Sequence, residues 1–359
     1  MSNEDKPENT PKIIYDLDFK ELQSILEGWG EPAFRSKQIW SAIYQQLVYS
    51  PEEISTLPVQ LRNRLSDEFN FSPLTPVDRL ASSDRQTVKT LFRLADQFAI
   101  EAVLMGYSDR QTLCISSQAG CLMNCSFCAT GQMGFQRHLT SGEIIAQVIY
   151  YAQQLKTEGK QVTNIVLMGM GEPFHNYDAV LAAMDRLNDS QGYNFGARRF
   201  TISTVGIIPG IRRFTEEDRQ YNLAISLHAA TDELRSSMLP INKKYPIAEL
   251  MSACRDYVDK THRRVTFEWA LIQDINDTPA HATELANLVK GMLCHVNVIP
   301  LNPTHRFSGK ATTRERAEAF RAQLEFHGIP CTVRMRRGID IQAGCGQLAT
   351  ASKKPINPS

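Results

Sequence analysis

Residues 112–131 read TLCISSQAGCLMNCSFCATG and join a strand-like run to a loop with three closely spaced cysteines. Cys121, Cys125 and Cys128 fall within eight residues, at steps of four and then three. Thiolates this close together indicate a metal site, but zinc ions and iron–sulfur clusters usually take four protein ligands. The sequence therefore predicts a metal centre whose fourth ligand comes from outside this loop.

A zinc ion is the alternative occupant of the loop. Zinc sites usually draw Cys-x2-Cys pairs from two separated segments, and a single three-cysteine loop departs from that form. An iron–sulfur cluster with one iron open to another ligand is the favoured interpretation. A non-enzymatic iron–sulfur or zinc protein remains an alternative at this point.

The chain that surrounds this loop alternates strand-like runs with amphipathic helical patterns. The capping-box form of Thr140 to Glu143 marks the start of one such helix. Repeated strand–helix units with six or seven strands predict an α/β fold, a full or partial TIM-type barrel and not a doubly wound sheet. The runs are TLCISS, NIVLMGM, RFTIST, YNLAISLH, VTFEWALI, HVNVIPLN and CTVRMR.

Polar or glycine-rich residues follow the strand-like runs. In such barrels the active site is built from the loops at the C-terminal ends of the strands. One cofactor pocket is therefore expected where these ends meet. Besides the cysteine loop, its candidate residues are Gly171, Glu172, Ser203, Ser226, Leu227, His228 and Asn302.

The N-terminal part has a different pattern. Short amphipathic helices are predicted between Asp16 and Phe71, and alternation on either side of Ala95 predicts a β-hairpin that leads into the core. The expected division is a flexible tail at 1–15, a helical accessory domain at 16–75, a β-hairpin at 84–108, a barrel core at 109–350 and a tail at 351–359.

Length and composition indicate the class of protein to which the chain belongs. The chain has 359 residues, with 42% hydrophobic and 22% charged, and it contains no run of eighteen apolar residues. Its N-terminal residues are polar and lack the basic segment followed by an apolar segment that a signal peptide has. We therefore expect a cytoplasmic protein without membrane association, in which eight reduced cysteines favour metal or catalytic roles.

Two further cysteines stand out from the pattern. Cys114 precedes Cys121 by seven residues, and Cys345 lies between Gly344 and Gly346, where the backbone can adopt unusual angles. Three others fall in apolar helix or strand patterns and are interpreted as small buried hydrophobic residues. These are Cys254, Cys294 and Cys331.

The formal net charge is zero, which argues against a generic nucleic-acid binder. Charge is nevertheless uneven, because the chain from Thr304 to its end carries ten Lys and Arg against four Asp and Glu. A solvated surface explains such a cluster, and a phosphate-facing patch is the alternative.

The three-cysteine spacing, with Gly-Glu-Pro after the second strand, resembles the radical S-adenosylmethionine enzymes. Over nearly the whole chain the sequence resembles the RlmN/Cfr family of RNA adenine methyltransferases, and its RlmN members most. The loop at 303–320 and Gly344, where Ala is more common, depart from the pattern. The resemblance rests on FRSKQIW, CLMNCSFCATGQMGFQRHLTSGEII, VLMGMGEPFHNYD, NLAISLHAATDELRSSMLPINKKYPI, RRVTFEWALI, LCHVNVIPLNP and GCGQL.

This resemblance implies the radical SAM type of partial (βα)6 barrel and one [4Fe–4S] cluster on Cys121, Cys125 and Cys128. S-adenosylmethionine would be the exchangeable fourth ligand, and two molecules would be used per turnover. The residues implied to bind it are the strand-end candidates, Gly171, Glu172, Ser203, Ser226, Leu227, His228 and Asn302.

The resemblance also implies a mechanism. Cys345 would be methylated first, and a radical formed from the methyl group would add to the adenine. Cys114 would resolve the protein–RNA thioether through a transient disulfide with Cys345. Glu101 would accept a proton, although a glutamate on a hairpin strand is by itself more often an exposed side chain.

The implied activity is methylation of adenine carbon 2 in 23S rRNA, in the peptidyl-transferase region, and beside the anticodon of tRNAs. Carbon-8 methylation of the Cfr type is the close alternative. The implied enzyme is a monomeric methyltransferase of EC class 2.1.1. Its partners would be the two RNAs, a flavodoxin or ferredoxin electron donor and a thiol reductant, with the helical domain binding RNA.

Overall fold

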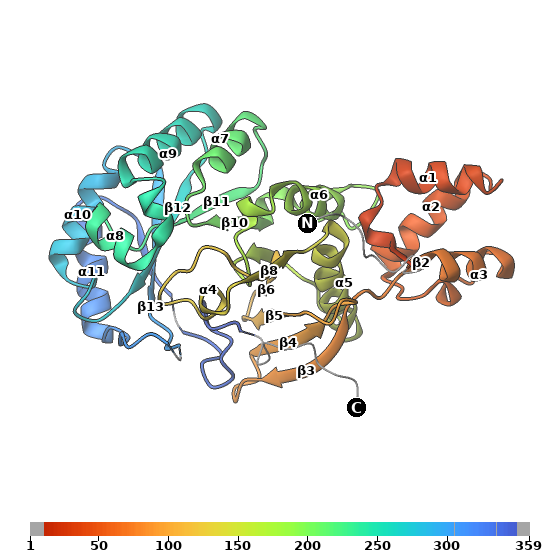
Figure 1. Cartoon of the computed structure of the whole chain (residues 1–359), viewed down its shortest axis with the longest axis horizontal. Helices are drawn as coiled ribbons and strands as arrows, with labels where there is room; N and C mark the ends of the chain where they lie inside the picture. Colours follow the sequence, from red (N-terminus) through yellow and green to blue (C-terminus); the bar gives the residue numbers. More distant parts are fainter. Residues whose placement is uncertain (1–10, 305, 335, 350–359) are drawn as a thin grey trace.

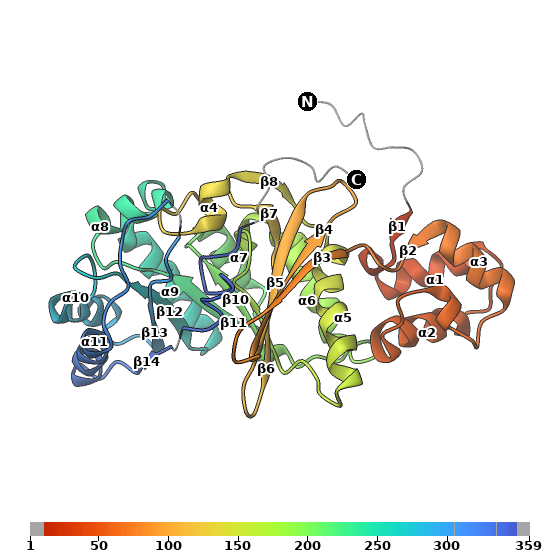
Figure 2. The same cartoon turned by 90° about the horizontal axis from the view of Figure 1, so that it is seen from below.

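The computed structural model describes residues 11–304, 306–334 and 336–349. Figures 1 and 2 show a small helical unit beside a larger body in which helices pack around one curved sheet. No helix in the described ranges is long and apolar enough to cross a membrane.

The helical unit contains three α-helices, each with an apolar face. Asp18 begins the first helix with a reciprocal capping box to Glu21. Leu22 and Leu26 of that helix are buried against the unit's core. A π-helical turn, Ala42–Gln46, extends the second helix. The α-helices are α1 (Phe19–Gly28), α2 (Phe34–Ser41) and α3 (Val59–Glu68).

The start of the described chain differs from the expected flexible tail at 1–15. β1 (Lys12–Ile13) pairs in parallel with β2 (Phe69–Asn70), and Ile14 and Tyr15 are buried. Asp16 accepts a hydrogen bond from the main chain of Gly142 at 2.7 Å. Apolar residues next to a polar tail thus anchor the helical unit to the barrel. The rest of that tail and the one at 351–359 lie outside the described residues.

One ten-stranded sheet forms the body of the molecule. Its order is β14-β13-β12-β11-β10-β9-β6-β5-β4-β3, parallel from β14 to β6 and antiparallel from β6 to β3. The strands are β3 (Thr75–Ala81), β4 (Thr87–Arg93), β5 (Ala99–Gly106), β6 (Gln111–Cys114), β9 (Asn164–Leu167), β10 (Phe200–Thr204), β11 (Asn222–Ser226), β12 (Val265–Leu271), β13 (Cys294–Pro300) and β14 (Cys331–Val333).

Helices follow most of the parallel strands and cover the outer face of the sheet (Figure 2). A short two-stranded sheet of β7 (Gln118–Gly120) and β8 (Phe135–His138) flanks the cysteine loop. The helices are α4 (Ala129–Met133), α5 (Ser141–Thr157), α6 (Tyr177–Asn188), α7 (Ile208–Glu216), α8 (Asp232–Met238), α9 (Ile247–Thr261), α10 (Pro279–Val289) and α11 (Arg314–Phe326).

The predicted fold class is confirmed. All seven strand-like runs form parallel strands, the capping box at Thr140 begins α5, and β4 and β5 form the predicted hairpin. The sequence patterns missed β3. Every residue of that strand is exposed, and it contains Pro76, so the apolar–polar alternation that marks a half-buried strand is absent.

Candidate active site

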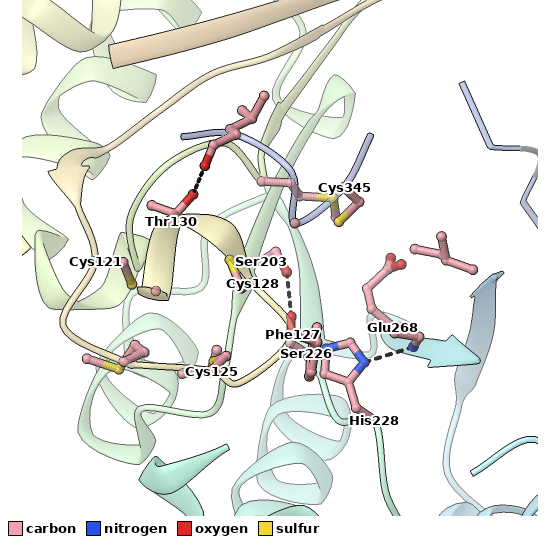
Figure 3. Close-up of a pocket in the computed structure, with 18 of the residues that line it drawn as sticks. Cys121, Cys125, Phe127, Cys128, Thr130, Ser203, Ser226, His228, Glu268 and Cys345 are labelled. Carbon is pink, nitrogen blue, oxygen red and sulfur yellow. Dashed lines mark hydrogen bonds between the residues drawn. The ribbon is translucent and has the colours of Figure 1, made fainter. Parts of the chain in front are cut away.

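A cavity of about 140 Å³ lies at the C-terminal ends of the parallel strands (Figure 3). It collects side chains from segments far apart in the sequence, as the barrel architecture requires. Its lining includes the candidate residues Cys121, Cys125, Cys128, Gly171, Glu172, Ser203, Ser226, His228, Asn302 and Cys345.

The cysteine loop and the C-terminal loop are hydrogen-bonded to each other. The Ala129 N–H donates to the Gly346 carbonyl at 2.7 Å, and the Thr130 hydroxyl donates to the Leu348 carbonyl at 2.6 Å. These bonds join residues more than two hundred positions apart, and they place Cys345 on the same cavity as the three-cysteine loop.

Two of the three clustered thiols, Cys121 and Cys125, are buried, and Cys128 is half-buried. Burial raises the pKa of Cys121 to about 12 and raises that of Cys125 well above its ordinary value. Thiolates in such surroundings need a bound cation. No group of three or more His, Cys, Asp or Glu within the described ranges is arranged around a single ion. A cubane cluster differs, because each cysteine binds a separate iron.

Other features of the cavity fit an organic cofactor. The buried Asn302 Oδ1 has no hydrogen-bond partner among the residues that the structure describes. Gly169 and Gly171 line the wall, where an added Cβ would come within 2.6 Å of the Ile115 carbonyl oxygen and 2.7 Å of the Gln118 side chain, respectively. Gly171 also has a φ of 106°. These glycines let the cavity wall pack closely against Ile115 and Gln118, and the three thiols with the unpaired Asn302 oxygen suit a cluster with a bound ligand.

Glu172 is held rigidly in the cavity wall. Its carboxylate accepts hydrogen bonds from the main-chain N–H groups of Phe174 and Val205, both at 2.9 Å. Its own N–H donates to the Gln118 side chain at 2.9 Å. Burial raises the pKa of Glu172 to about 7, against the lowering effect of the two N–H donors and Thr204.

Three further polar side chains come from neighbouring strand ends. The Ser203 and Ser226 hydroxyls are 3.3 Å apart. His228 Nδ1 accepts a hydrogen bond from the Ala270 N–H at 2.9 Å, so its ring proton is on Nε2. Burial lowers the pKa of His228 to about 3, with a smaller contribution from Arg235. Together they provide a neutral donor and two hydroxyls.

Cys114 lies beside the main cavity and not in it. It lines a side cavity of about 80 Å³ that it shares with Cys345. Both cysteines are free, with Cys114 buried and Cys345 exposed. The two thiols thus face one common space.

Two candidate residues do not line either cavity. The Leu227 side chain is fully buried in the core. Glu101 is buried and not exposed as a hairpin-strand glutamate usually is, and it lies 3.0 Å from Lys89. Its carboxylate also accepts a hydrogen bond from the Ala349 N–H at 2.9 Å. Glu101 therefore supports the C-terminal loop that carries Cys345.

Arg235 is a site residue that sequence patterns did not single out. It is fully buried, and it donates to the carbonyls of Leu227 and Val205 at 3.1 and 2.6 Å. Burial lowers its pKa to about 10. Arg235 therefore ties together the loops that follow β10 and β11. The surrounding sequence is an ordinary amphipathic helix, so only the fold identifies its role.

Two groups of arginines stand out in the basic C-terminal stretch. Arg316 pairs with Asp274 and Asp277, and Arg321 pairs with Glu318 and Glu325, so α11 has a balanced surface. The other group lines the side cavity with Cys114 and Cys345, and it comprises Arg334, Arg336 and Arg337. These three arginines make the side cavity, whose solvent-facing part is called the side opening below, positively charged. Lys353 and Lys354 lie outside the described residues.

The remaining cysteines lie away from both cavities. Cys254 and Cys294 are buried, and Cys331 is half-buried on β14. Gly344 contacts the site closely, because a Cβ there would come 2.6 Å from Asn302 Nδ2 and 2.8 Å from Gln347 Oε1. An alanine at this position would require both flexible side-chain ends to move.

Comparison with known proteins identifies relatives of the whole chain. The radical SAM superfamily model matches residues 115–286, and the ribosomal RNA large subunit methyltransferase N-terminal domain model matches residues 13–70. A probable dual-specificity RNA methyltransferase RlmN from Chloroflexus aurantiacus is 47% identical, covering 96% of this chain and 95% of its own. The dual-specificity RNA methyltransferase RlmN 1 of Myxococcus xanthus is 46% identical, covering 97% of both chains.

A solved structure agrees with these matches. The crystal structure of a radical SAM methyltransferase from Sphaerobacter thermophilus superposes with a TM-score of 0.92 and 50% sequence identity. The match covers 94% of this chain and 99% of that chain. The similarity therefore extends over the helical unit, the hairpin and the barrel together.

Proposed function

This chain belongs to the RlmN family of radical SAM RNA methyltransferases, and we propose that it methylates adenine carbon 2. The proposed substrates are an adenosine in the peptidyl-transferase region of 23S rRNA and the adenosine beside the anticodon of tRNAs. Membership in the radical SAM superfamily implies a [4Fe–4S] cluster and S-adenosylmethionine.

The observation that carries this proposal is the pairing of the two cysteine loops. Hydrogen bonds from Ala129 and Thr130 to the C-terminal loop bring Cys345 to the cavity lined by the clustered cysteines. A metal-binding protein without this chemistry would need neither Cys345 nor the adjacent Cys114. The geometry supports a reaction in which a protein thiol takes part beside a metal centre.

We assign the cofactor to the main cavity. Cys121, Cys125 and Cys128 would hold the cluster, and S-adenosylmethionine would bind at its open iron. When bound, this pair supplies the radical chemistry that unreactive carbon 2 requires. Glu172 and Gly171 would hold the amino group, and the ligand's other polar groups would meet Ser203, Ser226, His228 and Asn302. Leu227 contributes through its backbone and not its side chain.

The two other cysteines would handle the methyl carbon and the RNA. The Cys345 thiolate would take the methyl group of one S-adenosylmethionine, with S-adenosylhomocysteine as the leaving group. That methyl group would lose one hydrogen atom to the radical derived from the second S-adenosylmethionine, and its carbon would bond to adenine carbon 2, which gives up its proton to Glu101 and one electron to the metal centre. The Cys114 thiolate would then attack the Cys345 sulfur, so that a disulfide forms, the carbon–sulfur bond breaks, and the carbon keeps the electron pair and takes up a proton to leave as the methyl group of the base. A thiol reductant restores both cysteines. Their shared side cavity supports this pairing.

Glu101 is the proposed proton acceptor for carbon 2. Its carboxylate is held by Lys89 and by the Ala349 N–H, which connects it to the C-terminal loop. Burial raises the pKa of Glu101, and Lys89 counteracts this effect. A role in proton transfer requires that RNA binding shift this loop and expose the carboxylate to the base.

RNA would reach the site through the side opening. Arg334, Arg336 and Arg337 line this opening and would contact RNA phosphates. The helical accessory domain at 16–75 would bind RNA further from the reacting base. A flavodoxin or ferredoxin would supply electrons to the cluster, and the enzyme would act as a monomer.

The decisive experiment is an anaerobic reaction. The reconstituted enzyme is incubated with S-adenosylmethionine, a reductant and a 23S rRNA fragment, and digested nucleosides are identified by mass spectrometry. We expect 2-methyladenosine from the wild type. The Cys114→Ala variant should stop with RNA covalently attached, visible as a shifted band on a denaturing gel.

Two outcomes would contradict the proposal. Formation of 8-methyladenosine would assign the enzyme to the Cfr type of activity at the same site. Absence of both methylated nucleosides and of 5′-deoxyadenosine would exclude radical cleavage of S-adenosylmethionine. Cys254→Ala serves as the matched control, because that cysteine is buried away from both cavities.

A further inference from the structure

Glu268 is a buried carboxylate in the active-site cavity that takes no part in the proposed reaction steps. It lies on β12 in register with Ser226 on β11, and its side chain is 5% exposed. Its chain neighbours Phe267 and Trp269 are fully buried. Because side chains alternate along a strand, these two face the outer helices while Glu268 faces the barrel interior. Figure 3 shows its carboxylate extending from β12 toward Cys345.

The two oxygens of this carboxylate are in different situations. Oε1 accepts a hydrogen bond from Asn297 Nδ2 at 2.9 Å. Oε2 is buried and has no hydrogen-bond partner in the described parts of the chain. Arg334 is 4.0 Å away, which is beyond hydrogen-bonding distance. A buried acceptor left unpaired is destabilising, so a ligand donor at this position would recover free energy on binding.

The reactants of the proposed reaction contain a suitable donor. Both the target base and S-adenosylmethionine carry an adenine ring with an exocyclic amino group. Carboxylates accept hydrogen bonds from base amino groups in known recognition modes. The adenine amino group is on carbon 6, separated from carbon 2 by one ring nitrogen. A base that brings carbon 2 to Cys345 therefore brings its amino group into the same region of the pocket.

We propose that Glu268 Oε2 accepts a hydrogen bond from the amino group of the target adenine and thereby selects adenine at this site. This inference rests on the proposed function. The target base is favoured over the cofactor because Arg334, which faces Glu268, lines the side cavity with Cys114 and Cys345. Of the proposed cofactor contacts, Gly171 and Glu172 follow another strand, β9, whereas Ser226 adjoins Glu268 in the sheet. S-adenosylmethionine is therefore the competing ligand that the controls below test.

The Glu268→Gln variant distinguishes recognition from mere packing. Asn297 is a donor, so the glutamine oxygen should keep that bond and place its NH₂ group where Oε2 was. The position then becomes a donor. Inosine carries an acceptor at carbon 6 and retains a hydrogen on carbon 2, so it can in principle be methylated. The variant should therefore shift its preference from adenosine toward inosine.

The experiment uses reconstituted enzyme and RNA with adenosine, purine riboside or inosine at the target position. We expect wild type to prefer adenosine by about 10-fold over purine riboside and by about 100-fold over inosine. In Glu268→Gln the adenosine-to-inosine ratio of kcat/KM should fall at least about 10-fold. Glu268→Asp, which keeps the acceptor, should retain the wild-type order at a lower rate.

Controls separate the possible ligands. Glu143→Gln neutralises a buried carboxylate that pairs with Arg137 outside the pocket, and it should leave the ratio unchanged. Equilibrium dialysis measures S-adenosylmethionine affinity without RNA, which Glu268→Gln should leave within about 2-fold. Weaker affinity with equal loss on all three RNAs would assign Glu268 to the cofactor and overturn the inference.

Two further results would contradict either this inference or the proposed function. An unchanged ratio in Glu268→Gln, with an active wild type, would overturn this inference alone. A wild type that does not methylate the adenosine-containing RNA at carbon 2 would overturn the proposed function, and this inference with it.

Discussion

His228 combines a strained backbone with a buried ring. Its φ is 61°, in the left-handed region that few residues other than glycine and asparagine adopt. Its Nδ1 accepts the Ala270 N–H, its carbonyl accepts from Asn276 at 2.8 Å, and its ring contacts Phe127 edge-on at 5.0 Å. The residue therefore fixes the shape of the pocket floor. Because the ring is buried, this conformation is stable only while His228 is neutral.

The pH dependence of stability tests this arrangement. Burial lowers the pKa of His228 to about 3, below the value near 6.5 in the unfolded chain. Its stabilising contribution is therefore full above pH 6.5 and is lost as pH falls toward 3. Between pH 7 and 5 the loss should be about 2 kcal/mol. Urea denaturation of wild type and His228→Asn at both pH values measures it.

Asparagine suits this test because it tolerates the left-handed conformation and can accept the Ala270 N–H. The variant should be less stable than wild type at pH 7, and that deficit should shrink by about 2 kcal/mol at pH 5. A deficit equal at both pH values would contradict the assignment. His262→Asn is the matched control, because His262 has a φ of 53° but is exposed.

Helix α8 contributes to the pocket mainly through one residue. Thr231 begins the helix with a side-chain cap, and Arg235 extends from it to the carbonyls of Val205 and Leu227. The Val205 N–H in turn donates to Glu172. The helix thus positions a carboxylate from another strand–loop unit through a chain of hydrogen bonds.

Removal of Arg235 should loosen this unit. In Arg235→Leu the buried carbonyls lose their donors, and we expect a destabilisation of about 2–4 kcal/mol. S-adenosylmethionine affinity should fall as well, because Glu172 loses its fixed partner. Thermal unfolding and equilibrium dialysis measure the two effects. Arg213→Leu, at an exposed arginine on α7, should change stability only slightly. Equal effects of both changes would refute the role of Arg235.

Charge is distributed unevenly over the molecule, although its sum is zero. A large cavity of about 1010 Å³ at the N-terminal ends of the strands is lined by six arginines and one carboxylate, Glu268. Two of these arginines, Arg334 and Arg337, also line the side opening. A cationic surface therefore extends from the barrel interior to the outside, next to the proposed reaction site.

Reversal of charge at this opening should weaken RNA binding. For Arg336→Glu with Arg337→Glu, the slope of log affinity against log salt should decrease by about 1 for each RNA phosphate that the variant no longer neutralises. Fluorescence anisotropy with a labelled rRNA fragment over a salt series measures this slope. Arg212→Glu on α7 with Lys290→Glu just after the end of α10 makes the same change of charge at exposed positions away from the side opening. If both double variants behave alike, the side opening is not an RNA-binding surface.

Local sequence patterns were sufficient to predict the fold class and the candidate residues at the strand ends. Strand periodicity, capping boxes and the spacing of Cys121, Cys125 and Cys128 involve residues close together along the chain, so they can be read without the fold. The same holds for Gly171 and Glu172, which closely follow a strand. Barrel architecture then requires such residues to converge at one end.

Which side chains share a cavity, and which charges are paired, became clear only from the folded chain. Burial of Glu101 depends on Lys89 and the C-terminal loop, and the free oxygen of Glu268 depends on Asn297 and Arg334. Which arginines of the basic stretch are neutralised depends on acidic residues outside α11, because Arg316 pairs with Asp274 and Asp277. These properties are set by long-range neighbours, and periodicity along the chain carries no information about the desolvation or pairing of a charge.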